Sequence, residues 1–311
     1  MKQFDAAATA RALAFPSLID ALERLFAAGC EAPARHVHAV GDGLTALLMP
    51  AWLPGRYFGL KVVNVAPGNA ALGLPAVFAT YQLFDANTGA PLALIDGGEL
   101  TARRTAAASA LAASRLARED ARRQLIVGAG RVGGLLAQAY RAVRRIDDVM
   151  VWSRDEQSAL RLVVRLAAEG IPARVVTDLA TAAATADVVS CATLADEPLI
   201  RGDWLAPGSH LDLIGGFTPA MREADDACFA GAQVWIDTAD ALAKAGDLLH
   251  PIASGVLRRE DVRGTLADLA ATRSLARDPS ARTVFKSVGT ALEDLAAAIL
   301  VYESRQGSAL A

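Results

Sequence analysis

The chain contains the stretch Gln124-Leu125-Ile126-Val127-Gly128-Ala129-Gly130-Arg131-Val132-Gly133. A short apolar run leads directly into the pattern G-x-G-x-x-G, and a helical apolar pattern follows. This strand–turn–helix context is the one that the dinucleotide-binding fingerprint requires: a tight turn at Gly128, close approach of the backbone to a pyrophosphate at Gly130, and close helix packing at Gly133. The alternative is an ordinary glycine-rich turn. We expect a phosphate site at this helix start, with contacts from Gly128, Gly130, Arg131, Val132 and Gly133.

The second half of the fingerprint indicates which dinucleotide is bound. The next apolar run, Asp148–Trp152, ends at Ser153 and Arg154, about 20 residues after the last glycine. An NAD site usually places Asp or Glu there to bind the ribose 2′-hydroxyl. A hydroxyl and a guanidinium instead suit a 2′-phosphate. The sequence therefore favours NADPH, held by Ser153 and Arg154. Asp155 keeps NADH as an alternative, and Arg154 as a solvated residue at a helix start is the other interpretation.

Composition limits the class of protein. The chain has 311 residues, is 53% hydrophobic and carries a formal net charge of −3, so it can form one large or two ordinary domains with a substantial core. It contains no run of 18 apolar residues and no basic tract, which argues against a membrane span and a nucleic-acid partner. Cys30, Cys191 and Cys228 are far apart and odd in number, which argues against disulfides and zinc. We expect a cytoplasmic enzyme without a bound metal.

Lysine usage points to one side chain. Of 31 basic residues only four are lysine, and Lys61 lies inside the apolar run Tyr57–Val65. A buried ammonium must be paired or must lose its proton. Lys61 is therefore either a lysine at a strand edge that extends to solvent or a ligand-binding or catalytic group.

The remaining pattern indicates an α/β fold. We expect a helix over residues 1–29, strands and turns from His36 to Ile95, and a helix that starts at Thr101 and runs to about Leu116. Between Gln124 and Asp237, short apolar strands alternate with helical segments, which is typical of a doubly wound parallel sheet. A final helix is expected from Ala291.

Six ordered motifs resemble one family. They cover nearly the whole chain and are Met49-Pro50-Ala51, Gly59-Leu60-Lys61-Val62-Val63-Asn64, the segment 96–107 (DGGELTARRTAA), Gly128-Ala129-Gly130, the segment 204–210 (WLAPGSH) and the segment 283–289 (TVFKSVG). Together they closely resemble the ornithine cyclodeaminase/mu-crystallin family. The resemblance implies an α+β substrate-binding and dimerisation domain at 1–117, completed by a C-terminal helix at 291–311, and a Rossmann-type NAD(P)-binding domain at 118–290. It also implies a homodimer whose first domains pair through their sheets.

The resemblance also implies site residues. It assigns three cations to the carboxylate of a small substrate: Arg35, Lys61 and Arg104. It assigns three hydroxyl side chains to the dinucleotide: Thr105, Thr193 and Ser287. Arg104 as a surface residue of its helix, and Thr193 and Ser287 as helix caps, are the alternatives.

One position departs from the pattern of the cyclodeaminases. These enzymes carry an aspartate directly after two glycines, where it handles the amino groups of the substrate; here Phe217 follows Gly215 and Gly216. A phenylalanine cannot accept a proton or pair with an ammonium. The resemblance then favours a ketimine reductase that converts Δ1-pyrroline-2-carboxylate, or its piperideine homologue, by hydride transfer to C=N. Arg104 and Arg35 would hold the carboxylate, Lys61 would fix it or supply the proton, and Phe217 would form an apolar wall.

Two other functions stay open. The first is another enzyme of the family, either an ornithine cyclodeaminase with relocated acid–base chemistry or an amino-acid dehydrogenase. The second is a non-catalytic, NADPH-dependent binding protein of the mu-crystallin type. The lysine and arginines favour an enzyme, with Lys61 and Arg104 as the catalytic residues, and Phe217 favours the reductase.

Overall fold

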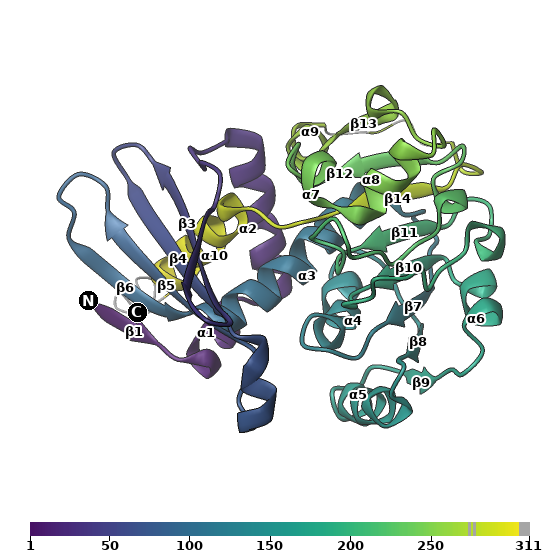
Figure 1. Cartoon of the computed structure of the whole chain (residues 1–311), viewed down its shortest axis with the longest axis horizontal. Helices are drawn as coiled ribbons and strands as arrows, with labels where there is room; N and C mark the ends of the chain where they lie inside the picture. The colour runs from purple at the N-terminus through teal and green to yellow at the C-terminus, as the bar shows by residue number, and fades with distance from the viewer. Residues whose placement is uncertain (273–274, 276–277, 305–311) are drawn as a thin grey trace. The chain divides into compact units, whose positions relative to one another are not determined.

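The computed structural model describes residues 1–272, 275 and 278–304, and the chain forms two compact units (Figure 1). The first unit is Met1–Arg104 with the segment that starts at Thr290, and the second is Thr105–Gly289. The division falls inside helix α3 (Gly97–Leu116), earlier than the expected boundary after residue 117. The functional roles expected of the two parts stay predictions, and residues 305–311 of the expected C-terminal helix lie outside the described residues.

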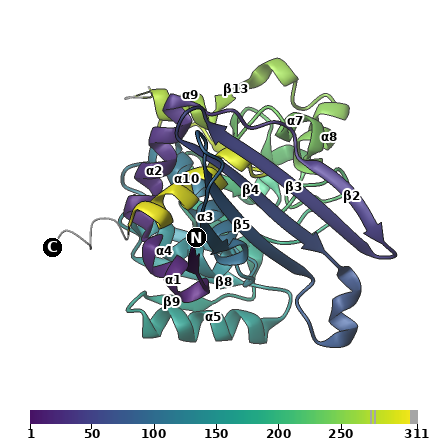
Figure 2. The same cartoon turned by 90° about the vertical axis from the view of Figure 1, so that its left-hand side faces the viewer.

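The first unit is built on a six-stranded sheet with the order β1-β6-β5-β4-β3-β2. Its strands are β1 (Lys2–Phe4), β2 (His36–Gly41), β3 (Leu44–Leu53), β4 (Tyr57–Val65), β5 (Val77–Asp85) and β6 (Pro91–Asp96). All neighbours are antiparallel except the pair β1 and β6. Helix α10 (Ala291–Glu303) packs across β3 to β6, and α2 (Phe15–Ala28) packs on α10, as Figure 2 shows.

The expectation of one helix over residues 1–29 is wrong. The segment forms β1, α1 (Ala6–Ala12) and α2 instead. Asp5 starts α1, because its side chain accepts a hydrogen bond from the Ala8 amide at 2.7 Å. Pro16 then lies in the first turn of α2, where proline is tolerated. In the interior of one continuous helix the same proline would break the helix.

Helix α3 also starts earlier than expected, at Gly97 rather than at Thr101. The Asp96 side chain accepts a hydrogen bond from the Glu99 amide at 2.7 Å, which satisfies an amide of the first turn. A Cβ at position 97 would lie 2.7 Å from the Thr80 backbone nitrogen. The glycine therefore allows the helix to begin directly against β5.

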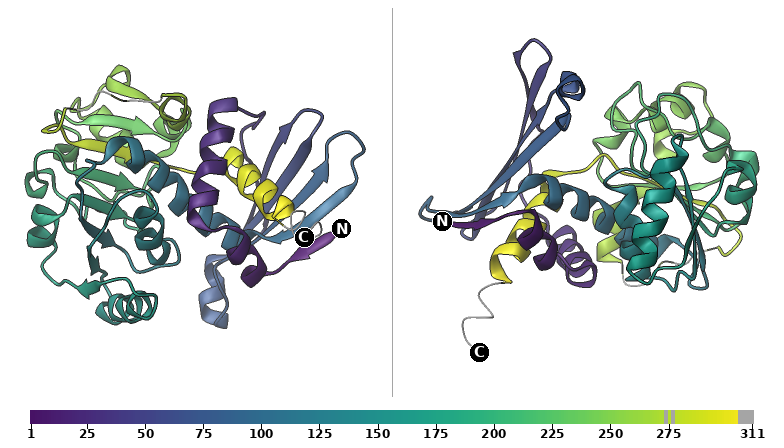
Figure 3. Two further views of the ribbon diagram at one scale, coloured as in Figure 1. Left: turned by 180° about the vertical axis from the view of Figure 1, so that it is seen from behind. Right: turned by 90° about the horizontal axis from the view of Figure 1, so that it is seen from below.

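The second unit contains an eight-stranded sheet in which all paired strands are parallel. In spatial order the strands are β13 (Val262–Thr265), β12 (Gln233–Ile236), β14 (Thr283–Lys286), β11 (His210–Leu213), β10 (Val188–Cys191), β7 (Arg123–Val127), β8 (Asp148–Trp152) and β9 (Ala173–Val175). The connecting helices are α4 (Gly133–Arg141), α5 (Glu156–Ala168), α6 (Leu179–Thr185), α7 (Ala241–Lys244), α8 (Gly246–Ala253) and α9 (Leu266–Ala271). Figures 1 and 3 show α4 and α6 on opposite faces. The expected doubly wound parallel sheet is confirmed.

A buried polar contact links two helices of this unit to the centre of its sheet. Asp212 on β11 accepts hydrogen bonds from Tyr140 of α4 at 2.8 Å and from Ser109 of α3 at 3.2 Å. Burial raises the pKa of Asp212 to about 7. Because buried polar groups favour arrangements that satisfy them, this contact fixes how α3 and α4 lie on β11.

Within the described residues, no helix is long and apolar enough to cross a membrane. The three cysteines carry free thiols: Cys30 is half-buried, and Cys191 and Cys228 are buried.

Candidate active site

Lys61 is a buried, paired cation rather than a lysine at a strand edge. Strand β4 places it between Met49 of β3 and Tyr81 of β5, and it is 1% exposed. Its Nζ lies 2.7 Å from Asp294 Oδ2 and donates to Thr101 Oγ1 at 3.3 Å. Burial lowers the pKa of Lys61 to about 8, although Asp294 opposes this shift. At neutral pH most of the ammonium therefore stays charged.

Arg104 is also buried, at 6% exposure, so it is not a surface residue of its helix. Its Nη1 donates to Glu293 Oε2 at 2.5 Å, and its Nε donates to Asp294 Oδ1 at 2.9 Å. Although burial disfavours its charge, the neighbouring Asp294 and Glu293 raise the pKa of Arg104. Burial also opposes ionisation of Asp294, but Lys61 and Arg104 lower its pKa below the usual value. Both partners therefore stay ionised.

These four residues, Lys61, Arg104, Glu293 and Asp294, form one ion cluster of two cations and two carboxylates. Arg104 has five N–H donors, and its hydrogen bonds to the described residues use two of them. The other three are available to a ligand. A guanidinium with two adjacent donors can bind a carboxylate in a bidentate manner. The cluster can therefore hold the carboxylate of a ligand in addition to those of Glu293 and Asp294.

Arg35 lies directly before β2, and its side chain is half-buried. In the β2–β3 register, His36 is opposite Leu48, and Met49 is opposite Lys61 on the far side of β3. Continuing this register by one residue sets Arg35 opposite Met49. Arg35 and Lys61 then occupy the same row of the sheet with one strand between them.

The glycine turn has the backbone geometry that the fingerprint needs. Gly128 follows β7 with φ +109°, and a Cβ there would lie 2.6 Å from the Ala192 carbonyl oxygen. A Cβ at Gly133, the first residue of α4, would lie 1.9 Å from the Gly128 oxygen. A Cβ at Gly130 meets nothing within 4 Å. The first and third glycines are thus required by packing, and the second faces open space where a ligand can approach. Arg131 is exposed, and Val132 is the N-cap of α4 without a side-chain cap.

Ser153 and Arg154 lie beside this turn. The Gly128 amide donates to the oxygen of Trp152, the last residue of β8, at 2.8 Å. Ser153 is half-buried and Arg154 is exposed. Asp155 is the N-cap of α5 and accepts hydrogen bonds from the Gln157 and Ser158 amides at 3.2 and 3.1 Å. Its carboxylate is therefore engaged by its own helix.

The other predicted residues of the second unit follow neighbouring strands. Thr193 comes after β10, Phe217 after β11 and Ser287 after β14. Because parallel strands end at one edge of their sheet, these loops share that edge with Gly128. Ser287 is buried and its amide donates to Leu213 at 3.1 Å, whereas Phe217 is 44% exposed. Thr105 is half-buried on α3.

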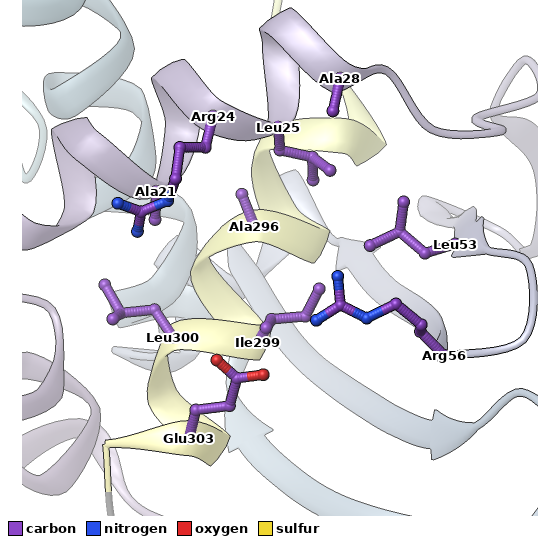
Figure 4. Close-up of a pocket in the computed structure, with 10 residues that line it drawn as sticks. All are labelled: Ala21, Arg24, Leu25, Ala28, Leu53, Arg56, Ala296, Ile299, Leu300 and Glu303. Carbon is purple, nitrogen blue, oxygen red and sulfur yellow. The ribbon is translucent and has the colours of Figure 1, made fainter.

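A pocket in the first unit holds none of the predicted site residues. It has a volume of about 260 Å³ and lies between α2, α10 and the turn after β3 (Figure 4). Its charged lining side chains are Arg24, Arg56 and Glu303, all exposed. Glu303 also accepts a hydrogen bond from Tyr57 at 2.9 Å.

Sequence reasoning missed the residues that hold the predicted ones or their loops. Partners of the predicted residues are Thr101, Glu293 and Asp294 in the first unit and Glu223 in the second. The neighbouring loops of the second unit are held by Asp237, Asp247 and Lys286. Two signals were present. Glu293 and Asp294 are adjacent acids in an apolar helix, and Lys286 is one of only four lysines and ends an apolar strand.

Comparisons with known proteins agree with this architecture. The ornithine cyclodeaminase/mu-crystallin family matches residues 9–309 of the chain. A Delta(1)-pyrroline-2-carboxylate reductase of Paracoccus denitrificans is 44% identical over 256 residues, which cover 81% of this chain and 80% of that protein.

Solved structures of similar proteins cover almost all of both chains. The Thermococcus litoralis Delta(1)-pyrroline-2-carboxylate reductase in complex with NADH and L-proline has a TM-score of 0.92 at 30% identity, covering 99% of this chain and 98% of that one. An archaeal alanine dehydrogenase dimer with bound NAD has a TM-score of 0.91 at 28% identity, covering 99% and 97%. These relatives are oxidoreductases, which confirms the expected enzyme class. From the match over nearly its full length and these relatives, the chain belongs to the ornithine cyclodeaminase/mu-crystallin family.

Proposed function

We propose that the chain reduces a small cyclic imino acid with NADPH, converting Δ1-pyrroline-2-carboxylate to L-proline and accepting the six-membered piperideine homologue. One observation carries this proposal: the buried ion cluster leaves three N–H donors of Arg104 available to a carboxylate. Two similar proteins named as reductases of this imino acid support the choice of substrate.

The residues of the chain bind and orient the substrate. Arg104 and Arg35 hold its carboxylate, which fixes the direction of the C=N bond. Lys61 contacts the same carboxylate or keeps the imine nitrogen protonated, since a group whose pKa is about 8 can give up a proton near neutral pH. Phe217 adds an apolar wall that excludes water and strengthens the electrostatic contacts. When bound, the dinucleotide supplies a hydride for the imine carbon.

NADPH is proposed as the preferred dinucleotide. The turn Gly128–Gly133, with Arg131 and Val132, would hold the pyrophosphate, and Ser153 and Arg154 would bind the 2′-phosphate. Asp155 is engaged as the cap of α5, which removes the nearest acid that could bind a free ribose 2′-hydroxyl. Thr105, Thr193 and Ser287 complete the proposed cofactor contacts. NADH remains the alternative, because two similar structures hold NADH or NAD.

A second candidate function is that of an amino-acid dehydrogenase, which reduces an open-chain imine. The similarity to an alanine dehydrogenase favours it, since that fold is shared over nearly the whole chain. Both candidates reduce C=N and use the same carboxylate contacts. Cyclodeamination needs a proton-accepting group that Phe217 cannot supply, and a binding protein of the mu-crystallin type would not need Lys61 near its titration range.

We also propose that the chain forms a homodimer through its six-stranded sheet, in the cytoplasm. Large apolar side chains are exposed on the edge strand β2, at Val37 and Val40, and on β5, at Val77 and Phe78. Exposed apolar side chains mark a protein interface where they form a patch. One similar protein is described as a dimer.

The reaction is tested with substrates of the competing enzymes. The chain should consume NADPH with Δ1-pyrroline-2-carboxylate and form L-proline, and it should release little ammonia from L-ornithine with NAD. Phe217→Asp should weaken the reductase about tenfold, because it puts a charge where an apolar wall is needed, whereas Phe217→Leu should retain most activity. Robust ammonia release from ornithine by the wild-type protein, without imine reduction, would overturn the proposal.

Cofactor preference is tested by titrating the protein with NADPH and NADH. NADPH should bind more tightly than NADH. Arg154→Ala should lower the ratio of the NADH to the NADPH dissociation constant about 10- to 100-fold, as expected for a lost charge-assisted contact of about 1.5–3 kcal/mol. Arg201→Ala, at an exposed arginine that pairs with Asp203, is the matched control and should leave the ratio unchanged. Equal dissociation constants in the wild-type protein contradict the assignment.

Carboxylate binding is tested at Arg104. Arg104→Lys keeps a cation but loses the paired donors, so kcat/KM should fall about 100-fold with NADPH affinity unchanged. Arg103→Lys, at the arginine that pairs with Glu99 on the same helix, is the control. Wild-type efficiency in Arg104→Lys would place the substrate elsewhere.

The pH profile tests the charge of Lys61. As the pH rises through about 8, Lys61 loses its proton and the ion cluster gains a net negative charge. Binding of a carboxylate should weaken, and kcat/KM should fall above that pH. Lys61→Arg should abolish this fall, because arginine stays charged. A wild-type profile that is flat from pH 7 to 9.5 speaks against a role for this ammonium.

Oligomeric state tests the proposed sheet interface. Light scattering should give twice the 32.4 kDa mass of the chain. Phe78→Glu should shift the protein toward the monomer, whereas Val164→Glu, at an exposed valine of α5, should not. A wild-type monomer at micromolar concentration is incompatible with the proposal.

A further inference from the structure

The buried carboxylate of Glu223 joins two loops at the carboxyl edge of the parallel sheet. Its Oε1 accepts hydrogen bonds from the Thr193 amide at 2.7 Å and the Thr193 hydroxyl at 2.8 Å. Its Oε2 accepts from the Gly215 amide at 2.7 Å. Glu223 is fully buried. One side chain therefore ties the loop after β10 to the loop after β11.

Glu223 is itself held in place by two more buried charges. Asp247 Oδ1 accepts hydrogen bonds from the backbone amides of Glu223 at 2.7 Å and Ala224 at 3.1 Å. Asp247 Oδ2 lies 3.1 Å from Lys286 Nζ, and both side chains are fully buried. Burial raises the pKa of Glu223, and Lys286 opposes that shift. Lys286 of β14 thus holds Asp247, and Asp247 in turn holds the backbone of Glu223 in position.

The two glycines before Phe217 make this arrangement possible. A Cβ at Gly215 would lie 1.8 Å from the Thr193 carbonyl oxygen and 2.6 Å from Glu223 Oε1. A Cβ at Gly216 would lie 2.3 Å from Asp247 Oδ2. Any side chain at either position would push the loop away from its carboxylate partners. The loop that carries Phe217 is therefore shaped around Glu223 and Asp247.

The contact with Glu223 sets the hydrogen-bonding role of Thr193. A hydroxyl has one proton and two lone pairs, and an ionised carboxylate only accepts. The Thr193 proton is directed at Glu223 Oε1, and the Ala195 amide donates to Thr193 Oγ1 at 3.3 Å. Within the described contacts, one lone pair of Thr193 remains. Toward a ligand this hydroxyl can accept a hydrogen bond but cannot donate one.

Thr193 lies where the second half of a dinucleotide would pass. A Cβ at Gly128 would lie 3.0 Å from Thr193 Cγ2. Strand β7 has β8, with Ser153 and Arg154 after it, on one side and β10 on the other. A dinucleotide whose pyrophosphate lies on the glycine turn and whose adenosine ribose lies after β8 places its nicotinamide riboside toward β10. A hydrogen-bond acceptor at this place suits a part of the ligand that carries an O–H or N–H donor. It disfavours a phosphate group, which has no such donor at neutral pH.

We propose that Glu223 is a positioning residue that fixes Thr193 as a hydrogen-bond acceptor for the nicotinamide riboside of the bound dinucleotide. The donor is either the carboxamide N–H or the 2′-hydroxyl of the nicotinamide ribose. This proposal rests on the dinucleotide binding proposed above, and it adds a residue that selects the chemical form of the nicotinamide half.

The test measures dissociation constants rather than rates, because dinucleotide analogues differ in redox potential. NADP is compared with its 3-acetylpyridine analogue, which lacks the carboxamide N–H, and with an analogue that lacks the 2′-hydroxyl of the nicotinamide ribose. The wild-type protein should bind one analogue about tenfold more weakly than NADP, and which one identifies the donor. Equal affinity for all three ligands overturns the proposal.

Variants then separate the role of Glu223 from a general structural role. Glu223→Ala removes the carboxylate to which the Thr193 hydroxyl donates and frees this hydroxyl to donate to the ligand, so the tenfold discrimination should fall to about one. Thr193→Val should lose the discrimination, and Thr193→Ser should retain it. Glu197→Ala, at an exposed glutamate of the same loop, is the matched control. Wild-type discrimination in a folded Glu223→Ala variant contradicts the inference.

Three further outcomes complete the test. If Glu223→Ala does not fold, the comparison of Thr193→Val with Thr193→Ser decides alone: equal discrimination in these two variants overturns the role of the hydroxyl. If the wild-type protein binds neither NADP nor NAD, the proposed function fails. If it binds NADP but does not discriminate between NADP and the two analogues, only the role of Glu223 fails.

Discussion

The buried ion cluster is the interaction on which the first unit depends. Lys61 on β4 and Arg104 on α3 are neutralised by Glu293 and Asp294, which are adjacent on α10. Removing buried charges from water is costly, and only close geometry with further hydrogen bonds compensates for that cost. The last helix must therefore return to the sheet formed by the first hundred residues. The same charges keep Arg104 ionised and oriented, so folding of the unit and the proposed binding of a carboxylate rely on one set of contacts.

The second unit is held by carboxylates that bind backbone amides. Glu223 joins the loops after β10 and β11, and Asp237 accepts hydrogen bonds from the Val288 and Gly289 amides at 2.7 and 2.6 Å. The loops that carry Thr193, Phe217 and Ser287 are thus fixed before any ligand is present. Pre-organisation of this kind reduces the entropy lost on binding. The proposed site, which is made of loops, gains rigidity from these contacts.

Sequence alone predicted the parts of this picture that depend on local pattern. The glycine turn and the alternation of strands and helices after Gln124 follow from neighbouring residues, and the apolar run around Lys61 made its burial one of two alternatives. The starts of α2 and α3 were missed because Pro16 and Asp96 override the apolar periodicity. The partners of Arg104 were missed because they lie 189 and 190 residues away in the chain. Lys286, like Lys61, is a rare lysine in an apolar strand, so the same pattern indicates its burial.

The central claim is that the residues around the ion cluster present a cyclic imine to the hydride of a bound dinucleotide. The most direct measurement follows a deuterium label from the C4 position of the reduced dinucleotide into the product. With Δ1-pyrroline-2-carboxylate and the dinucleotide labelled on the transferred face, the account predicts L-proline with one deuterium at Cα, detected by NMR and mass spectrometry. Labelling at C4 on the opposite face should give unlabelled L-proline. Consumption of the dinucleotide without deuterium at Cα from either face, or no turnover of the imine, would contradict the account.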